Sequence, residues 1–463
     1  MTQRLNYDYI LQTNVRGKPY VTVSAKGLSN GLSDIPNDGA DFGPDTPGTQ
    51  TSGIQEAMNY SATSPLYSPD LGHLFYPIKL LAGNYNFSTP ITYGIGNFPS
   101  TDNFSISITG VGYVTTSLTY SGTGNAITID SAINNIYIAD FSIDNYPTNT
   151  ANNLIYWNSS KGIGSNVLTV ENINNGYSPS SNLMYFNNVY IATIKNVVSG
   201  STYGIYITGV GSNAGFLYMQ NQIWAGVQTY IGNFDIAYIS GVNNEINVVE
   251  PITMLKIINN AGGSNLPWGV AGVITNATVN SIMIENSVLG AGGNPPIIIN
   301  RNVQYMKLIN NTVSGTLISS FNTGASLTIG TLSIDGLYNI GTQGKFMDVT
   351  NITINEYDLK NIPDGTFTNM PTQSSTNGTT AGTVSMNAVE YRAKYKKYVI
   401  TFSGYENNTT TNQTINFPLP FSSYAVITGN NTGLTITAST TGITITSPNS
   451  TTTYSGIVIV EGY

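Results

Sequence analysis

IYIADFSIDN (136–145), LTIGTLSIDG (327–336) and ITINEYDLKN (352–361) repeat one pattern of apolar residues. In each copy, apolar side chains occupy relative positions 1, 3, 6 and 8, and a polar turn follows. Alternation with a period of two residues predicts a strand with one buried face. The two residues between positions 3 and 6 interrupt the alternation, so we expect the chain to bend there. Strand, corner, strand and turn in repetition predict a β-solenoid.

Partial copies of the pattern fill the interval between these segments. They begin at Leu168, Val189, Ile205, Ile236, Leu255, Ile282 and Met306. The mean spacing is about 24 residues, which suits one coil of a three-sided parallel β-helix built from short strands. Asn196 takes the place of the fourth apolar residue in the copy at Val189, and we expect stacked asparagines to form a ladder along the coils. The alternative interpretation is a sandwich or barrel of unrelated short strands.

The composition predicts a surface with few charges. Charged residues make up 9% of the 463 residues, against about 25% in an ordinary soluble domain. Asn, Thr, Ser, Tyr and Gln must therefore cover the surface, which suits acidic surroundings and the binding of glycans, whose groups are hydroxyls. A net charge of −8 with 16 basic residues argues against nucleic acid as a partner.

The chain has no cysteine, which excludes disulfides and thiolate metal sites. The N-terminal residues show no apolar run of signal-peptide length, and no run of about 18 apolar residues predicts a membrane span. We expect no cofactor and no metal. A surface suited to the outside of the cell, without an export signal, favours a virion protein that is assembled inside the host cell and works on the virion surface.

Composition divides the chain into four parts. Residues 1–50 form an N-terminal attachment or extended segment, rich in Gly, Pro and Asp. Residues 51–370 contain one helix and then the β-helix. Residues 371–383, which begin with PTQSSTNGTTA, form a linker. Residues 384–463 form a β-rich C-terminal domain.

The start of the second part resembles the entry of the pectin-lyase-like right-handed β-helix superfamily. DGADFGPDTPGTQTSGIQEAMNY (38–60) and IKLLAGNYNFSTPI (78–91) carry this resemblance. Thr51 or Ser52 can cap a short helix, whose Ile54, Ala57 and Met58 lie on one face and can cover the open end of the coils. Gly83 permits the turn before Tyr85. The superfamily includes enzymes, phage tailspikes and inert fibres.

The C-terminal part is similar to the small terminal β-domain of viral tail fibres. TINFPLPFSSYAVITGN (414–430), GITITSPNS (442–450) and TYSGIVIVEGY (453–463) carry this resemblance. The whole chain resembles tail or spike proteins of archaeal spindle-shaped viruses, from hot and acidic habitats. The resemblances imply an all-β chain, a right-handed parallel β-helix followed by a small C-terminal β-sandwich-like domain.

The sequence shows no recognisable catalytic constellation. The Asp and His motifs of the hydrolase branch are missing. His73, the one histidine, and Arg301 have no sequence neighbours that would complete an active site, so we expect structural roles for both. Carboxylates such as Asp140 and Asp144, or Glu245 and Glu285, could still form an acid pair across adjacent coils.

Three aspartates in DGADFGPD, Asp38, Asp41 and Asp45, raise the question of a calcium site. The run departs from an EF-hand loop, because no Glu stands at the twelfth position. We expect a tight turn with helix-capping carboxylates instead.

Aromatic side chains are the candidate glycan-binding residues, since sugars stack on aromatic faces. These candidates are Trp224, Trp268, Tyr405 and Tyr424. Possible glycosylation sites in Asn-x-Ser/Thr sequons are Asn86, Asn276, Asn351, Asn412 and Asn449.

The sequence therefore favours a virion tail or spike protein that attaches to the host surface, with a host glycan or glycoprotein and other tail proteins as partners. A homo-oligomer is expected, most simply a trimer joined through residues 384–463. The first alternative is a β-helix polysaccharide lyase or glycosidase. The second is a cellular adhesin or surface-layer component.

Overall fold

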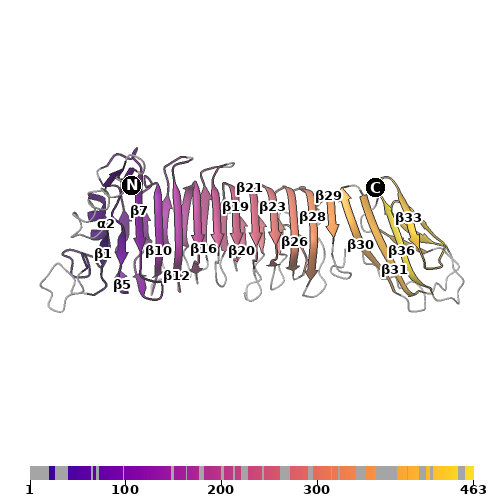
Figure 1. Ribbon diagram of the computed structural model, residues 1–463, viewed down its shortest axis with the longest axis horizontal. Coiled ribbons are helices and arrows are strands. Elements are labelled where there is room, and N and C mark those ends of the chain that lie inside the picture. Colours follow the sequence, from indigo (N-terminus) through magenta and orange to yellow (C-terminus); the bar gives the residue numbers. More distant parts are fainter. Residues whose placement is uncertain are drawn as a thin grey trace, which may run out of the picture. The chain divides into compact units, whose positions relative to one another are not determined.

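The computed structural model describes residues 20–26, 40–63, 66–68, 72–96, 98–146, 151–162, 164–176, 182–199, 203–211, 214–220, 228–241, 245–260, 272–289, 296–313, 315–321, 324–339, 351–360, 383–393, 395–405, 413–417, 421–446 and 454–463. The chain splits into two compact units, Met1–Leu255 and Lys256–Tyr463. Strands make up almost all of the regular secondary structure that is described in each (Figure 1). No helix among the described residues is long and apolar enough to cross a membrane.

The first unit contains one helix, α2 (Ile54–Thr63), and short strands. The strands are β1 (Val21–Val23), β2 (Leu66–Ser68), β3 (Gly72–Leu74), β4 (Ile78–Leu80), β5 (Gly83–Phe87), β6 (Ile91–Tyr93), β7 (Phe104–Thr109), β8 (Thr116–Tyr120), β9 (Gly124–Ile129), β10 (Asn135–Asp144), β11 (Ala151–Asn158), β12 (Val167–Asn175), β13 (Asn182–Val189), β14 (Ile191–Lys195), β15 (Val198–Ser199), β16 (Tyr203–Gly209), β17 (Phe216–Gln220), β18 (Gln228–Gly232), β19 (Phe234–Ser240) and β20 (Glu245–Val248).

The second unit continues with strands alone among its described residues, and β21 (Ile252–Ile258) spans the division. Its strands are β22 (Val273–Thr275), β23 (Val279–Glu285), β24 (Val288–Leu289), β25 (Ile297–Ile299), β26 (Val303–Val313), β27 (Ile318–Ser319), β28 (Leu327–Asn339), β29 (Ile352–Lys360), β30 (Thr383–Ala393), β31 (Tyr395–Tyr405), β32 (Gln413–Asn416), β33 (Ala425–Asn430), β34 (Ile436–Ala438), β35 (Gly442–Ile445) and β36 (Tyr454–Gly462).

The first unit is a parallel β-helix, as the repeat predicts. Its first sheet pairs β7, β10, β12, β14, β17 and β19 in parallel. Its second sheet pairs β6, β9, β11, β13, β16, β18 and β20 in parallel. The two halves of β10 pair with different strands, β7 and β8, so the bend predicted inside the repeat is confirmed for the copy at 136–145.

A column of apolar side chains fills the interior behind the first sheet. Register partners Ile138, Val170, Ile194, Met219 and Ile239 are each at most 1% exposed. In the second unit, Ile284, Ile329 and Ile354 are likewise buried, so the inward orientation expected from the alternation is confirmed.

The corner of the repeat is a residue in left-handed conformation. Asp140, Asn172 and Asn196 have φ of 65°, 55° and 51°, a region that Asn and Asp tolerate better than other side chains. Asn196 donates from Nδ2 to Asn172 Oδ1 at 2.9 Å. The expected ladder is therefore present, but Asn196 stands at the corner and not in a fourth apolar position.

Several partial copies of the repeat begin at a different point of the coil from the one that the sequence pattern suggested. Ala192, and not Val189, pairs with Leu168, because Val189 ends β13 in the second sheet. Ile205 also lies in the second sheet, in β16. Leu327 pairs with Ile352 as predicted, yet their coil has its left-handed residue at Gly336, after position 8. In the copy at 136–145 the corner at Asp140 separates the two apolar pairs, whereas in the copy at 327–336 both pairs precede the corner.

Helix α2 covers the first coils of the β-helix. Ile54, Ala57 and Met58 are buried, which confirms the predicted apolar face. Gln55 Oε1 accepts from Thr92 N at 2.7 Å and its Nε2 donates to Thr92 O at 2.8 Å. The side-chain amide thus binds β6, at the edge of the second sheet, much as a neighbouring strand would, which protects an exposed edge.

The turns around α2 also follow the prediction. Thr51 Oγ1 accepts from Gln55 N at 3.0 Å and caps the helix, whereas Ser52 donates to Asn86 O. Gly83 has φ of 147°, and a Cβ there would lie 2.4 Å from the Cβ of Ala25. Both the positive φ and the lack of space for a Cβ therefore require glycine at position 83.

The C-terminal residues form antiparallel sheets, as expected of a small β-sandwich-like domain. In one sheet, β31 pairs with β30 and β36, and β36 pairs with β33. In the other, β35 pairs with β32 and β34. Tyr398 on β31 stacks on Phe417 with ring centroids 4.7 Å apart, which joins the sheets. Strand β30 also pairs with β29.

Candidate functional site

A row of tyrosines lies on the outer face of the second sheet of the first unit. The row comprises Tyr156, Tyr185, Tyr206 and Tyr230, which are register partners on β11, β13, β16 and β18. Strand alternation turns these rings outward, because the preceding Ile155 and the following Trp157 are fully buried. Each coil of this stretch thus contributes one phenol to the same line.

The rings stack on one another along the row. Ring centroids are 5.2 Å apart between Tyr156 and Tyr185, 4.6 Å between Tyr185 and Tyr206, and 6.0 Å between Tyr206 and Tyr230. The first two pairs are nearly parallel, at 14° and 5°. Since each face covers the next, the row presents ring edges and hydroxyl groups to solvent.

Amide ladders flank the tyrosines on both sides. On one side, Asn153 donates to Asn125 and Asn182 donates to Asn153, each at 2.9 Å. On the other, Asn187 donates from Nδ2 to Asn158 Oδ1 at 3.1 Å, and Thr208 donates to Asn187. An amide has two donor hydrogens and an oxygen with two lone pairs, so each ladder keeps hydrogen-bonding capacity for a ligand.

We call these tyrosines and the two ladders the tyrosine–amide strip. On β11, β13 and β16 the strip contains no charged side chain. Burial raises the pKa of the Tyr185 hydroxyl, and Tyr156 makes a smaller contribution in the same direction. Burial also raises the pKa of the Tyr206 hydroxyl, with smaller contributions from Tyr185 and Glu250. Both phenols therefore stay neutral and can donate hydrogen bonds. Such a surface suits a neutral ligand rich in hydroxyls.

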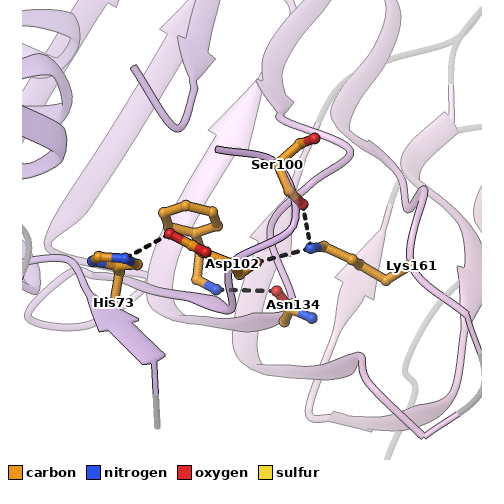
Figure 2. Close-up of polar contacts among 6 residues, drawn as sticks. His73, Ser100, Asp102, Asn134 and Lys161 are labelled. Carbon is orange, nitrogen blue, oxygen red and sulfur yellow. Dashed lines mark hydrogen bonds and ion pairs between the residues drawn. The ribbon is translucent and has the colours of Figure 1, made fainter. Parts of the chain in front are cut away.

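The one histidine lies in a different polar cluster, which Figure 2 shows. His73 Nε2 is 2.9 Å from Asp102 Oδ2, and its ring packs against Phe98 and Phe104 with centroids 5.1 and 5.2 Å away. A histidine–carboxylate pair can serve a nucleophile. Here two phenylalanines enclose the ring, which is the environment of a structural contact.

Lys161 holds the same turn from a later coil. Its Nζ donates to Ser100 O at 2.6 Å and to Asp102 O at 2.8 Å (Figure 2). Desolvation lowers the pKa of Lys161, while Asp102 and Asp130 act in the opposite direction. Phe104 N donates to Asn134 Oδ1 at 3.0 Å, so the cluster fastens residues 100–104 to the coils.

The other candidate catalytic residues have structural partners. Asp140 accepts from Asn172 Nδ2 at 2.8 Å, and Asp144 accepts from Gly176 N at 2.7 Å. Glu285 lies 3.6 Å from Lys256. Arg301 Nη1 donates to Asn300 O at 2.9 Å. The side chain of Glu245 is buried.

The aspartate run shows the expected turn where it is described, with Thr46 N donating to Gly43 O at 3.0 Å, but Asp41 binds strand β1 and does not cap a helix. Asp41 Oδ2 accepts from Thr22 N at 2.9 Å and from Thr22 Oγ1 at 2.8 Å, while Asp38 lies outside the described residues. Within the described part of the chain, no group of three or more acidic or histidine side chains could hold a metal ion.

The tyrosine–amide strip, as defined above, includes none of the aromatic residues chosen from the sequence. Trp224 and Trp268 lie outside the described residues, and only the backbone of Tyr405 is described, in β31. Tyr424 is 49% exposed, with its ring centroid 5.7 Å from that of Tyr463. Sequence reasoning missed the tyrosine row, although its signal is readable in LIYWN (154–158), LMYFN (183–187), GIYIT (204–208) and QTYIG (228–232).

The sequons differ in accessibility. Asn86 and Asn276 are exposed, and Asn351 is half-buried. Asn276 Oδ1 accepts from Asn300, and Asn351 donates to Ala325 O. Asn412 and Asn449 lie outside the described residues.

Comparison of the chain with protein-family models, with curated proteins and with solved structures gives no match. The resemblance to pectin-lyase-like and tail-fibre proteins therefore rests on the sequence motifs alone.

Proposed function

We propose that this chain is a non-enzymatic attachment protein that binds a neutral glycan on its tyrosine–amide strip. One observation supports the proposal most strongly. The strip aligns phenol hydroxyls and amides over successive coils without a charged side chain on β11, β13 or β16. A glycan presents hydroxyls at regular intervals, and such groups exchange hydrogen bonds with phenols and amides.

The resemblance to viral tail proteins supplies the setting of this proposal. The protein would lie on the surface of a virion, contact other tail proteins and bind a host glycan or glycoprotein. It would assemble as a homotrimer through residues 384–463, so that several weak sites bind one cell surface together.

An array of neutral polysaccharides and oligosaccharides, probed with the full chain, tests the binding. We expect Tyr185→Ala to lose most of the bound signal, because it opens the middle of the stack. Tyr113→Ala is the matched control, since Tyr113 is 42% exposed outside the strip. Equal loss in both variants, or no binding by the wild-type chain, would refute the proposal.

The same incubation separates binding from catalysis. Reducing ends and unsaturated products are assayed after the wild-type chain has been held with each bound polysaccharide. We expect neither to accumulate. Chain shortening that depends on the protein would replace the attachment role with the lyase or glycosidase alternative.

A further inference from the structure

A pocket lies at the edge of the second sheet of the first unit, beside helix α2. Its volume is about 530 Å³, within the range of about 300–1,000 Å³ that is usual for small-ligand sites. Its walls come from α2, from β6 and from the loop that follows β6. Gln55, Asn59, Thr92, Gly94 and Phe98 are among the lining residues.

The pocket continues the line of the tyrosine row. Thr92 on β6 pairs with Thr128 on β9, and Thr128 pairs with Tyr156 on β11. All three side chains belong to the outer face of the sheet, because the residues on either side of each are buried. Neighbouring strands lie about 4.8 Å apart, so Thr92 is about 10 Å beyond Tyr156 along the row. A ligand on the tyrosine–amide strip can therefore extend into the pocket.

Helix α2 closes the row at this point. Strand β6 is the edge strand of the second sheet, and α2 lies at the end of the stacked strands (Figure 1). Gln55 fixes the helix there through its two hydrogen bonds with the backbone of Thr92. Its Nε2 also donates to Asn59 Oδ1 at 2.9 Å. The two amides thus form a wall across the direction of the row.

The lining groups suit a neutral sugar residue. Asn59 and Thr92 are exposed, so the Asn59 Nδ2 hydrogens and the Thr92 hydroxyl can reach a ligand. Phe98 is half-buried, with the ring of His73 5.1 Å away. A sugar ring combines hydroxyls with an apolar C–H face that stacks on such an aromatic ring. Among the described lining residues, none has a charged side chain.

Gly94 keeps the pocket open. Its φ lies outside the left-handed region, and a Cβ there would meet Asp130 Oδ2 at 3.6 Å, an ordinary contact. The backbone at position 94 therefore tolerates a side chain. Because Gly94 stands two residues after Thr92, that side chain would lie on the same face as Thr92 and occupy the pocket. What glycine provides at this position is space for a ligand.

We propose that this pocket holds the terminal sugar residue of the neutral glycan on the tyrosine–amide strip, a role that rests on the proposed function. The protein then recognises chain ends, because α2 stops a chain that follows the row. An apolar ligand would leave the amides and the Thr92 hydroxyl without partners, which is unfavourable. An ionic ligand would find no opposite charge among the described lining residues.

Chain length tests the recognition of ends. The polysaccharide with the strongest signal on the array is partly hydrolysed, separated into fractions of known mean length and titrated with the full chain. For fractions that span the strip, we expect dissociation constants per chain end to agree within about twofold. Binding within the chain would instead give a constant value per sugar residue, because longer chains offer more sites. That result would overturn the proposal.

Two variants test the pocket itself. We expect Gly94→Leu, which fills it, to weaken binding at least about tenfold, and Asn59→Ala, which removes an amide, about fivefold. Gly324→Leu is the control for the first, since a Cβ there meets nothing within 4 Å. Asn84→Ala is the control for the second, because Asn84 is exposed outside the pocket. Both controls should bind like wild type.

Failure of the pocket and failure of the strip give different results. Normal binding by Gly94→Leu and Asn59→Ala, together with weak binding by Tyr185→Ala, would overturn the pocket and retain the strip. A wild-type chain that binds no glycan would overturn both. Asn59→Ala keeps the test decisive if Gly94→Leu does not fold, since alanine is favourable at an exposed helix position.

Discussion

Asn172 donates a hydrogen bond from Nδ2 to Asp140 Oδ1 at 2.8 Å and accepts one from Asn196 at its own Oδ1 at 2.9 Å. All three residues have positive φ. One residue type therefore meets two needs of the coil, since Asn tolerates the left-handed corner and its amide links neighbouring coils.

Substitutions at Asn172 should separate these two contributions. We expect Asn172→Ala to lower the free energy of unfolding by about 2–3 kcal/mol, from two lost hydrogen bonds and a strained corner. Asn172→Gly should cost about 1 kcal/mol less, because glycine accepts positive φ. Urea unfolding measures both, and equal losses would show that backbone strain is unimportant here.

The buried face of β14 can be tested at two adjacent residues. Ile194 is fully buried and Thr193 faces outward. We expect Ile194→Ala to cost about 2–5 kcal/mol and Thr193→Ala within about 0.5 kcal/mol of zero. A larger effect at Thr193 than at Ile194 would place the wrong face of β14 in the core.

Buried phenols should make the fold sensitive to alkali. Burial raises the pKa of Tyr93 well above 10.0, partly offset by its hydrogen bond with Ser61. Because the folded pKa exceeds the unfolded one, this stabilisation is complete below pH 10 and is lost as the pH rises through the folded pKa.

The measurement is urea unfolding at several pH values between 9 and 12. Each such tyrosine should contribute a slope of up to about 1.4 kcal/mol per pH unit above pH 10. Tyr93→Phe should reduce the slope, and an unchanged slope would mean that Tyr93 is not the group that titrates.

Asp144 should protect Asn175, which precedes Gly176, from deamidation. Cyclisation requires Gly176 N to lose its proton and attack the side-chain carbonyl of Asn175. Gly176 N donates to Asp144 at 2.7 Å, and Asn175 Nδ2 is held by Ile143 O at 2.8 Å. A carboxylate so close disfavours a negative charge on that nitrogen.

Peptide mapping after prolonged incubation measures this protection. We expect Asp144→Ala to deamidate several-fold faster at Asn175 than wild type when both are folded, and at the same rate when both are in denaturant. Equal rates in the folded proteins would assign the protection to burial alone.

The sequence predicted the fold wherever the apolar pattern within a single strand or helix is sufficient. The alternation in 136–145 placed Ile138 in the core, and the IQEAM segment placed Ile54 and Met58 against the first coils. The phase of the copies was harder, because turns of different length separate the strands. Val189 and Ala192 are equally plausible starts until the pairing partner, Leu168, is known.

The candidate site was less accessible to sequence reasoning. Tyr156 and Tyr185 are 29 residues apart and Tyr185 and Tyr206 only 21, so no fixed period reveals the row. The stack depends on parallel pairing between coils, which a single strand does not encode. His73 and Asp102 likewise meet only because β3 pairs with β7.

The most direct test of the glycan-binding account is a calorimetric titration of the full chain with a polysaccharide that binds on the array. Tyr206→Phe removes one hydroxyl from the row and keeps the ring stack, so we expect it to weaken binding about fivefold to tenfold. The wild-type dissociation constant should not change between about 50 and 500 mM salt, because the strip is uncharged. A dissociation constant that Tyr206→Phe leaves unaltered, or one that rises steeply with salt, would contradict recognition of a neutral glycan by the tyrosine–amide strip.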